Sequence, residues 1–158
     1  MFKSVLVLTA SLTALAAAPA LAEEPASAGP LDLTRRIVAT SGAAGEDSAG
    51  YVRIRNGSPV ADELLSVSCA CAERVEFHRI NRGPDRVSME ADPVWVVPGT
   101  GALDVRPGSD LHFMLINFDP AGSAAGRVVL TLTFRDAGAV QADFVLAADS
   151  RAAWTAFD

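Results

Sequence analysis

The stretch RVVLTLTFRDAGAVQADFVLA, residues 127–147, decides the fold class of this protein. RVVLTLTF and AVQADFVLA are both rich in β-branched and aromatic residues and alternate in polarity. The segment RDAG separates them and ends in a glycine, which is typical of a turn between antiparallel strands. Alternation with a period of two places successive side chains on opposite faces of a sheet. The stretch therefore predicts a β-hairpin with one buried face.

The chain outside this hairpin has the same character. Roughly eight or nine short strand candidates, such as YVRIR and LHFMLINF, are separated by turn clusters such as NRGPDR and DPAGSAAG. No segment has the pattern of a convincing amphipathic helix, and nothing repeats at a fixed period. These features predict a single all-β domain, either a sandwich or a barrel.

The chain opens with MFKSVLVLTASLTALAAAPALA, in which Lys3 precedes a short apolar run and Ala-Leu-Ala closes it. This pattern predicts a secretory signal peptide over residues 1–22, cut after Ala22. A retained membrane helix is the weaker interpretation, because the apolar core is short and no charge follows it. Residues 23–32 predict a flexible leader. Residues 33–148 are the expected β domain, and residues 149–158 a tail that is loose or briefly helical.

The net charge of the chain argues against some classes of binding partner. The formal net charge is −6, and lysines and arginines form no cluster. Such a surface has little attraction for nucleic acid or for anionic lipid. No stretch after the first 22 residues is long and apolar enough to span a bilayer. We therefore expect an exported protein that neither spans the membrane nor binds nucleic acid.

Four residues of unusual type lie close together: His78, Met89, His112 and Met114, with the spacing H-x10-M-x22-H-x-M. Beyond the predicted signal peptide they are all the histidines and methionines that the sequence contains. Two imidazoles and two thioethers form a soft, uncharged ligand set, which suits Cu(I) better than hard cations such as Mg²⁺ or Ca²⁺. The cluster predicts a copper site.

Strand geometry allows these four side chains to meet. If RVEFHRI and RVSMEAD pair about a turn centred between the glycine and proline of NRGPDR, His78 faces Met89 directly, with Cβ atoms about 4.5–5.5 Å apart. His112 and Met114 are two residues apart on one strand and project from the same face. The structural alternative is that Met114 fills the core, His112 is a hydrogen-bonded buried histidine, and His78 is a surface residue on an edge strand.

Two cysteines, Cys69 and Cys71, occur in the segment SCAC. Export would expose them to an oxidising compartment. On an extended strand their Cα atoms would be about 6.6 Å apart, near the upper limit for a disulfide. Three interpretations remain: inert core residues, a local disulfide, or additional soft copper ligands. We favour a structural or disulfide role, with additional copper ligation next.

The metal-ligand spacing is accompanied by further motifs. AGYVRIRNGSPVADELLSV, RVEFH, VPGTGALDVRPGSDLHFML and LTLTFRDAGAV together cover about residues 37–146. They resemble the A-Y-L-x-I-x-N opening, the V-E-[LI]-H segment, the P-x-G-x-x-x-L-x-P-G-x-x-H-x-M-L block and the closing hairpin of the periplasmic copper chaperones called PCuAC. The hallmark of that family is H-(M)-x10-M-x21-22-H-x-M.

The resemblance implies a cupredoxin-like or immunoglobulin-like Greek-key β-sandwich. It also implies that His78, Met89, His112 and Met114 hold Cu(I) in the periplasm. The implied partner is a copper-accepting protein, either the oxidase subunit that carries the CuA centre of cytochrome c oxidase or a Sco-type copper protein. The chain departs from the family pattern at Arg79, where a methionine often follows the first histidine, and it lacks a His/Met-rich tail. A second copper ion is therefore not expected.

Two other function classes remain. A metal-free, immunoglobulin-like binding or assembly module of the cell envelope would be compatible with the same fold. An enzyme has little support, because the sequence contains no nucleophile motif and a site filled by four protein ligands has no open position for a substrate.

Overall fold

The hairpin at residues 127–147 consists of β10 (Arg127–Phe134) and β11 (Gly138–Ala147). The register pairs Val128 with Phe144 and Leu132 with Val140. Val128, Leu132 and Phe144 are buried, whereas Val129 between them is half exposed. The alternation read from the sequence therefore matches the two faces of the hairpin, and this prediction is confirmed.

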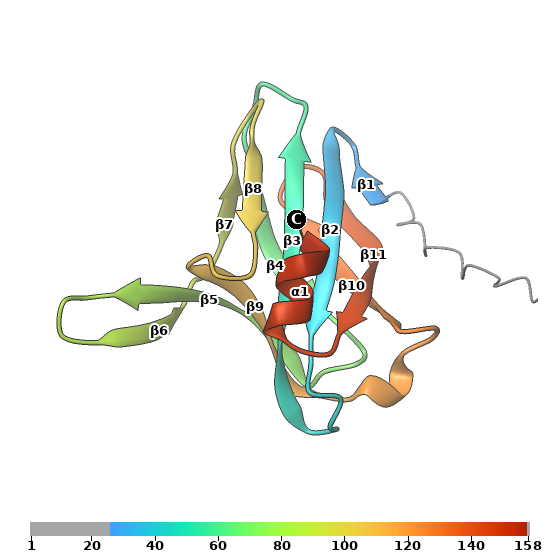
Figure 1. Ribbon diagram of the computed structural model, residues 1–158. Coiled ribbons are helices and arrows are strands. Elements are labelled where there is room, and N and C mark those ends of the chain that lie inside the picture. Colours follow the sequence, from blue (N-terminus) through green and yellow to red (C-terminus); the bar gives the residue numbers. More distant parts are fainter. Residues whose placement is uncertain (1–25, 158) are drawn as a thin grey trace, which may run out of the picture.

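The computed structural model describes residues 26–157. Apart from a short 3-10 turn at Pro120–Gly122, their elements are strands and one C-terminal helix (Figure 1). The other elements are β1 (Ala26–Ala28), β2 (Leu31–Ala39), β3 (Glu46–Asn56), β4 (Asp62–Ser68), β5 (Arg74–Arg82), β6 (Val87–Ala91), β7 (Trp95–Val97), β8 (Ala102–Val105), β9 (Leu111–Phe118) and α1 (Ser150–Phe157).

The strands follow one another in the order β6-β5-β9-β3-β2-β11-β10-β4-β7, with β1 on β2 and β8 on β3. All pairs are antiparallel except β11 with β2. Strand β3 pairs with β2 along one edge, and along the other edge its first half pairs with β9 and its second half with β8. The sheet folds over, so that β4, β10 and β11 lie behind β2 and β3 in Figure 1. The result is a β-sandwich, and the predicted fold class is confirmed.

The main core lies between the layers. It is built from the inward side chains of the strands, among them Leu33, Ile54, Phe113, Leu130 and Phe144, all essentially inaccessible to solvent. Phe77 of β5 stacks on Trp95, with ring centroids 4.6 Å apart. This aromatic contact anchors the base of the β5–β6 hairpin, whose far end projects away from the sandwich in Figure 1.

The predicted flexible leader is wrong for residues 26–32. Ala26 and Ala28 are buried and pair with Leu33 and Leu31 across a tight turn, in which Gly29 has a positive φ of 55°. Composition concealed this strand, because its stability comes from backbone pairing with β2 and from small side chains that fit against the core. The signal peptide and residues 23–25 lie outside the described residues.

The tail at residues 149–158, expected to be loose or briefly helical, forms helix α1 over Ser150–Phe157. The Asp149 carboxylate accepts a hydrogen bond from the backbone N–H of Ala152 at 2.7 Å, which caps the first turn. Ala153 and Phe157 are buried in a small second cluster with Ile37 and Tyr51. The helix therefore closes one side of the sandwich. None of the described helices is long and apolar enough to cross a bilayer.

Candidate metal centre

Three neighbouring strands, β6, β5 and β9, carry the four residues singled out by the sequence. Phe77 and Phe113 point into the core. Because side chains alternate along a strand, the neighbouring His78 and His112 point to the opposite face. The register pairs His78 directly with His112, and their rings lie edge to face with centroids 5.6 Å apart.

Met89 reaches the same place by a different register from the one predicted. The structure pairs Met89 with Ile80, and His78 with Ala91. The predicted register implied a two-residue turn at Gly83 and Pro84, and Pro84 cannot take the positive φ that the second position of a type I′ turn requires. The loop instead spans residues 83–86, closed by a hydrogen bond of 3.0 Å from Gly83 N–H to the Arg86 carbonyl.

The consequence for the site is small, because the shift is two residues and not one. A shift of one would have moved Met89 to the other face, whereas a shift of two keeps it on the face of His78. Its Sδ atom lies 2.9 Å from Nδ1 of His78. The contact that the sequence predicts between these residues is therefore present, although they are diagonal and not directly opposed.

Met114 lies one cross-strand pair further along the same face of β9. It is paired with Glu76 on β5 and with Ala49 on β3, and its side chain is partly exposed. The structure therefore brings His78, Met89 and His112 into a single cluster and places Met114 beside it.

The three clustered residues differ in their access to solvent. His112 is only 7% exposed, the His78 side chain 14%, and Met89 49%. Burial, and next the nearby His78, lowers the pKa of His112. A lowered pKa keeps this imidazole neutral at neutral pH, which is the form that can ligate a metal. The cluster thus has a buried end at His112 and an open end at Met89.

Glu76 is a member of this cluster that sequence reasoning missed. Its Oε2 atom lies 2.9 Å from Nε2 of His78, and its Oε1 accepts a hydrogen bond of 2.7 Å from Nε of Arg74. Hydrogen bonds from Arg74 and then from His78 lower the pKa of the Glu76 carboxyl. The available signal was its position two residues before His78, which places both on one face of a strand.

The donor set determines which metals the cluster suits. Within residues 26–157 no group of three or more histidines, cysteines, aspartates or glutamates is arranged to hold a metal ion. A site on this face therefore depends on the thioethers of Met89 and Met114. Thioether donors favour soft ions over Mg²⁺, Ca²⁺ or Mn²⁺.

Cys69 and Cys71 form a disulfide, with Cα atoms 5.0 Å apart. The longer separation expected for a strand does not apply, because β4 ends at Ser68 and the two cysteines lie in the turn that follows. Cys71 is buried against the core. Of the three interpretations, the local disulfide is the one present, and in this oxidised state neither sulfur is a thiolate ligand.

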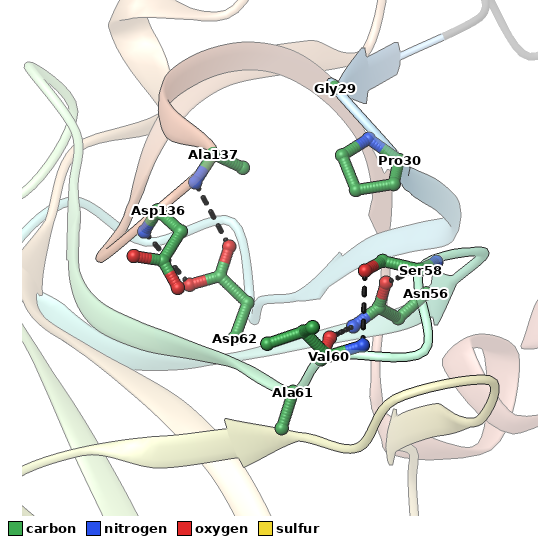
Figure 2. Close-up of a pocket in the computed structure, with 9 residues that line it drawn as sticks. All are labelled: Gly29, Pro30, Asn56, Ser58, Val60, Ala61, Asp62, Asp136 and Ala137. Carbon is green, nitrogen blue, oxygen red and sulfur yellow. Dashed lines mark hydrogen bonds between the residues drawn. The ribbon is translucent and has the colours of Figure 1, made fainter.

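A separate hollow lies beside the start of β4 (Figure 2). Its buried carboxylate, Asp62, accepts hydrogen bonds of 3.0 Å from the backbone N–H groups of Asp136 and Ala137 in the β10–β11 turn. Burial alone would raise the pKa of Asp62, but these N–H donors, with that of Glu63, lower it overall. The Asp62 carboxylate therefore has a structural role in this hollow, because it holds the β10–β11 turn.

Comparison with known proteins places this geometry in context. A family model described as "Putative lipoprotein LpqE-like" matches residues 31–146. The copper-bound PCuAC domain from PmoF2 matches with a TM-score of 0.64 and 19% identity, covering 79% of this chain and 98% of that domain. The apo PCuAC domain from PmoF1 matches with a TM-score of 0.63 and 19% identity, covering 79% of this chain and 99% of that domain.

Apo-DR1885 from Deinococcus radiodurans gives a TM-score of 0.56 at 20% identity, covering 90% of this chain and 95% of that one. No curated protein matches the chain. At such low identity these likenesses establish a shared fold, the cupredoxin-like β-sandwich of PCuAC domains.

Proposed function

This chain belongs to the LpqE-like family, and we propose that it is a copper-trafficking protein of the cell envelope. It would hold one Cu(I) ion through His78, Met89, His112 and Met114 and pass the ion to another protein. The PCuAC domain from PmoF2, which shares the fold, is copper-bound.

One observation carries the proposal. Nδ1 of His78 lies 2.9 Å from Sδ of Met89, and the same imidazole faces the ring of His112 across the β5–β9 pair. Two imidazoles and a thioether thus lie next to one another on the outward face of three neighbouring strands. Neutral imidazole and thioether donors together favour Cu(I).

The gradient of exposure suits transfer of the ion. Met89 lies on β6, the edge strand of the sheet, and is half exposed, whereas His112 is buried. An incoming ligand from a partner would replace the accessible thioether first, while the imidazoles keep hold of the ion. Thioethers carry no charge and need no deprotonation, so that step requires no proton transfer.

The partner would be a protein that accepts copper. By the resemblance of the sequence motifs, the candidates are the CuA centre of cytochrome c oxidase and a Sco-type copper protein. The signal-peptide pattern supports a periplasmic location for the exchange. The family description names a lipoprotein. In this sequence the first cysteine is Cys69, which forms the disulfide with Cys71.

Metal analysis of the mature protein tests the proposal. Residues 23–158 would be titrated anaerobically with Cu(I) against a chromophoric chelator, and we expect one ion per chain. Val87→Ala is the matched control, because Val87 is an exposed apolar residue two positions before Met89 on the same strand. Loss of binding in Met89→Ala with full binding in Val87→Ala supports the site. A wild-type protein that binds no Cu(I) would instead indicate the metal-free binding or assembly module.

A further inference from the structure

Glu76 is held in a defined position beside His78. The two residues are separated by one position on β5 and share its outward face. One carboxylate oxygen, Oε2, contacts Nε2 of His78 at 2.9 Å, while the other, Oε1, is bonded to Nε of Arg74 at 2.7 Å. Each oxygen thus has its own partner, and the Arg74 contact restrains the carboxylate from turning away from the histidine.

This arrangement selects one tautomer of His78. A neutral imidazole carries its proton on only one nitrogen. Nε2 faces a carboxylate and Nδ1 faces the thioether of Met89 at 2.9 Å. A carboxylate is a far stronger acceptor than a thioether, so the proton resides on Nε2. Nδ1 then directs its lone pair towards the sulfur.

Nδ1 of His78 and the sulfur of Met89 are then two unprotonated donors side by side on the outward face, and their 2.9 Å separation would have to widen for both to bind one ion. Building on the proposed function, we propose that Glu76 is a positioning residue that fixes the Nε2–H tautomer of His78, so that copper binds through Nδ1, the nitrogen on the side of Met89. Arg74 supports Glu76 in this role. The carboxylate itself does not touch the metal.

The role can be separated from a structural one, because the Glu76 side chain is about one-third exposed and its loss leaves no cavity in the core. Outer carboxylates that orient a metal-bound histidine typically contribute about 10–100-fold to metal affinity. The informative variants are Glu76→Leu, which removes the acceptor, and Glu76→Gln, which restores an acceptor oxygen of the same reach.

Glu73→Gln is the matched control. Glu73 also pairs with Arg74, through Nη1 at 2.9 Å, but no contact joins it to His78. It lies just outside β5 and is exposed, so its substitution removes a similar charge and a similar ion pair. Urea melts of all three apo variants would verify that they remain folded.

Long-range ¹H–¹⁵N NMR of His78 provides a readout independent of affinity. In wild-type apo protein at mildly alkaline pH we expect the Nε2–H tautomer, and with Cu(I) added we expect metal on Nδ1 with the proton retained on Nε2. Glu76→Leu should lose the tautomer preference and bind Cu(I) about tenfold or more weakly. Glu76→Gln should recover most of both, and Glu73→Gln should behave as wild type.

Metal on Nε2 in the wild type, or unchanged Cu(I) affinity in a folded Glu76→Leu variant, would overturn the inference and leave the copper site itself intact. A wild-type protein that binds no Cu(I) would overturn the proposed function. In that case the tautomer of the apo protein still shows whether Glu76 controls His78, so the two failures are distinguishable.

Discussion

Replacing Met89 by alanine tests whether this residue is a metal ligand or part of the core, because loss of a core side chain destabilises the fold far more than loss of an exposed ligand. Full burial of a methionine side chain stabilises a protein by about 1.5–3 kcal/mol. Met89 is 49% exposed and lies on the edge strand β6. About half of that burial is present, so Met89→Ala should lower the free energy of unfolding of the apo protein by about 1.5 kcal/mol at most. The buried Leu132, cut to alanine, should cost about 2–5 kcal/mol.

For copper affinity the order of the two variants should be reversed. Met89→Ala removes a thioether 2.9 Å from Nδ1 of His78, and we expect at least a tenfold loss of Cu(I) affinity, or about 1.4 kcal/mol. Leu132→Ala should bind copper normally wherever it remains folded. Urea melts of the apo proteins and chelator competition on the same samples measure both quantities. A Met89→Ala protein that unfolds like the core variant yet binds Cu(I) normally would refute the assignment.

Three further predictions follow from the same face and its surroundings. Cu(I) should bind much more tightly than Cu(II), in competition titrations with a separate chelator for each ion; equal or tighter Cu(II) binding would contradict the soft-ligand argument. A Cys69→Ser/Cys71→Ser double variant should still bind one Cu(I) per chain, because the disulfide leaves no thiolate to ligate; half stoichiometry or less would return the cysteines to the site. Burial lowers the pKa of His112, so the unfolded chain takes up this proton more readily and stability rises with pH. The free energy of unfolding should therefore fall as pH drops below about 6.5, and it should fall less steeply in His112→Asn. Urea melts at several pH values measure this dependence. The same pH dependence in both proteins would argue against a buried neutral imidazole at His112.

Most of the fold follows from local patterns. The alternation in β10 and β11 predicts their buried and exposed faces correctly, because a strand with one face on the core must repeat with a period of two. The prediction failed at residues 26–32, where Pro, Ala and Gly are typical of a loose leader. Strand β1 forms there because β2 offers unpaired backbone groups and the small side chains of Ala26 and Ala28 fit beneath the sheet.

The candidate site divides in the same way. His112 and Met114 share a face because they are two residues apart on one strand, a relation that periodicity alone supplies. The pairing of His78 with Met89 was approximately right and its register wrong, because loop length depends on which backbone angles Gly83 and Pro84 can adopt. Glu76 was missed because its position two residues before His78 indicates a shared face, whereas the contact itself depends on Arg74 and His78 as the structure places them.

By itself the sequence determined the all-β class, the common face of His112 and Met114, and the soft character of the ligand set. These properties depend on residue type and on the two-residue period of a strand, which are local. Only the tertiary structure decided that β5 pairs with β9 and sets His78 against His112, and that Arg74 holds Glu76 against the same imidazole. Pairing between distant strands depends on how the whole sheet closes over its core, and no local pattern contains that information.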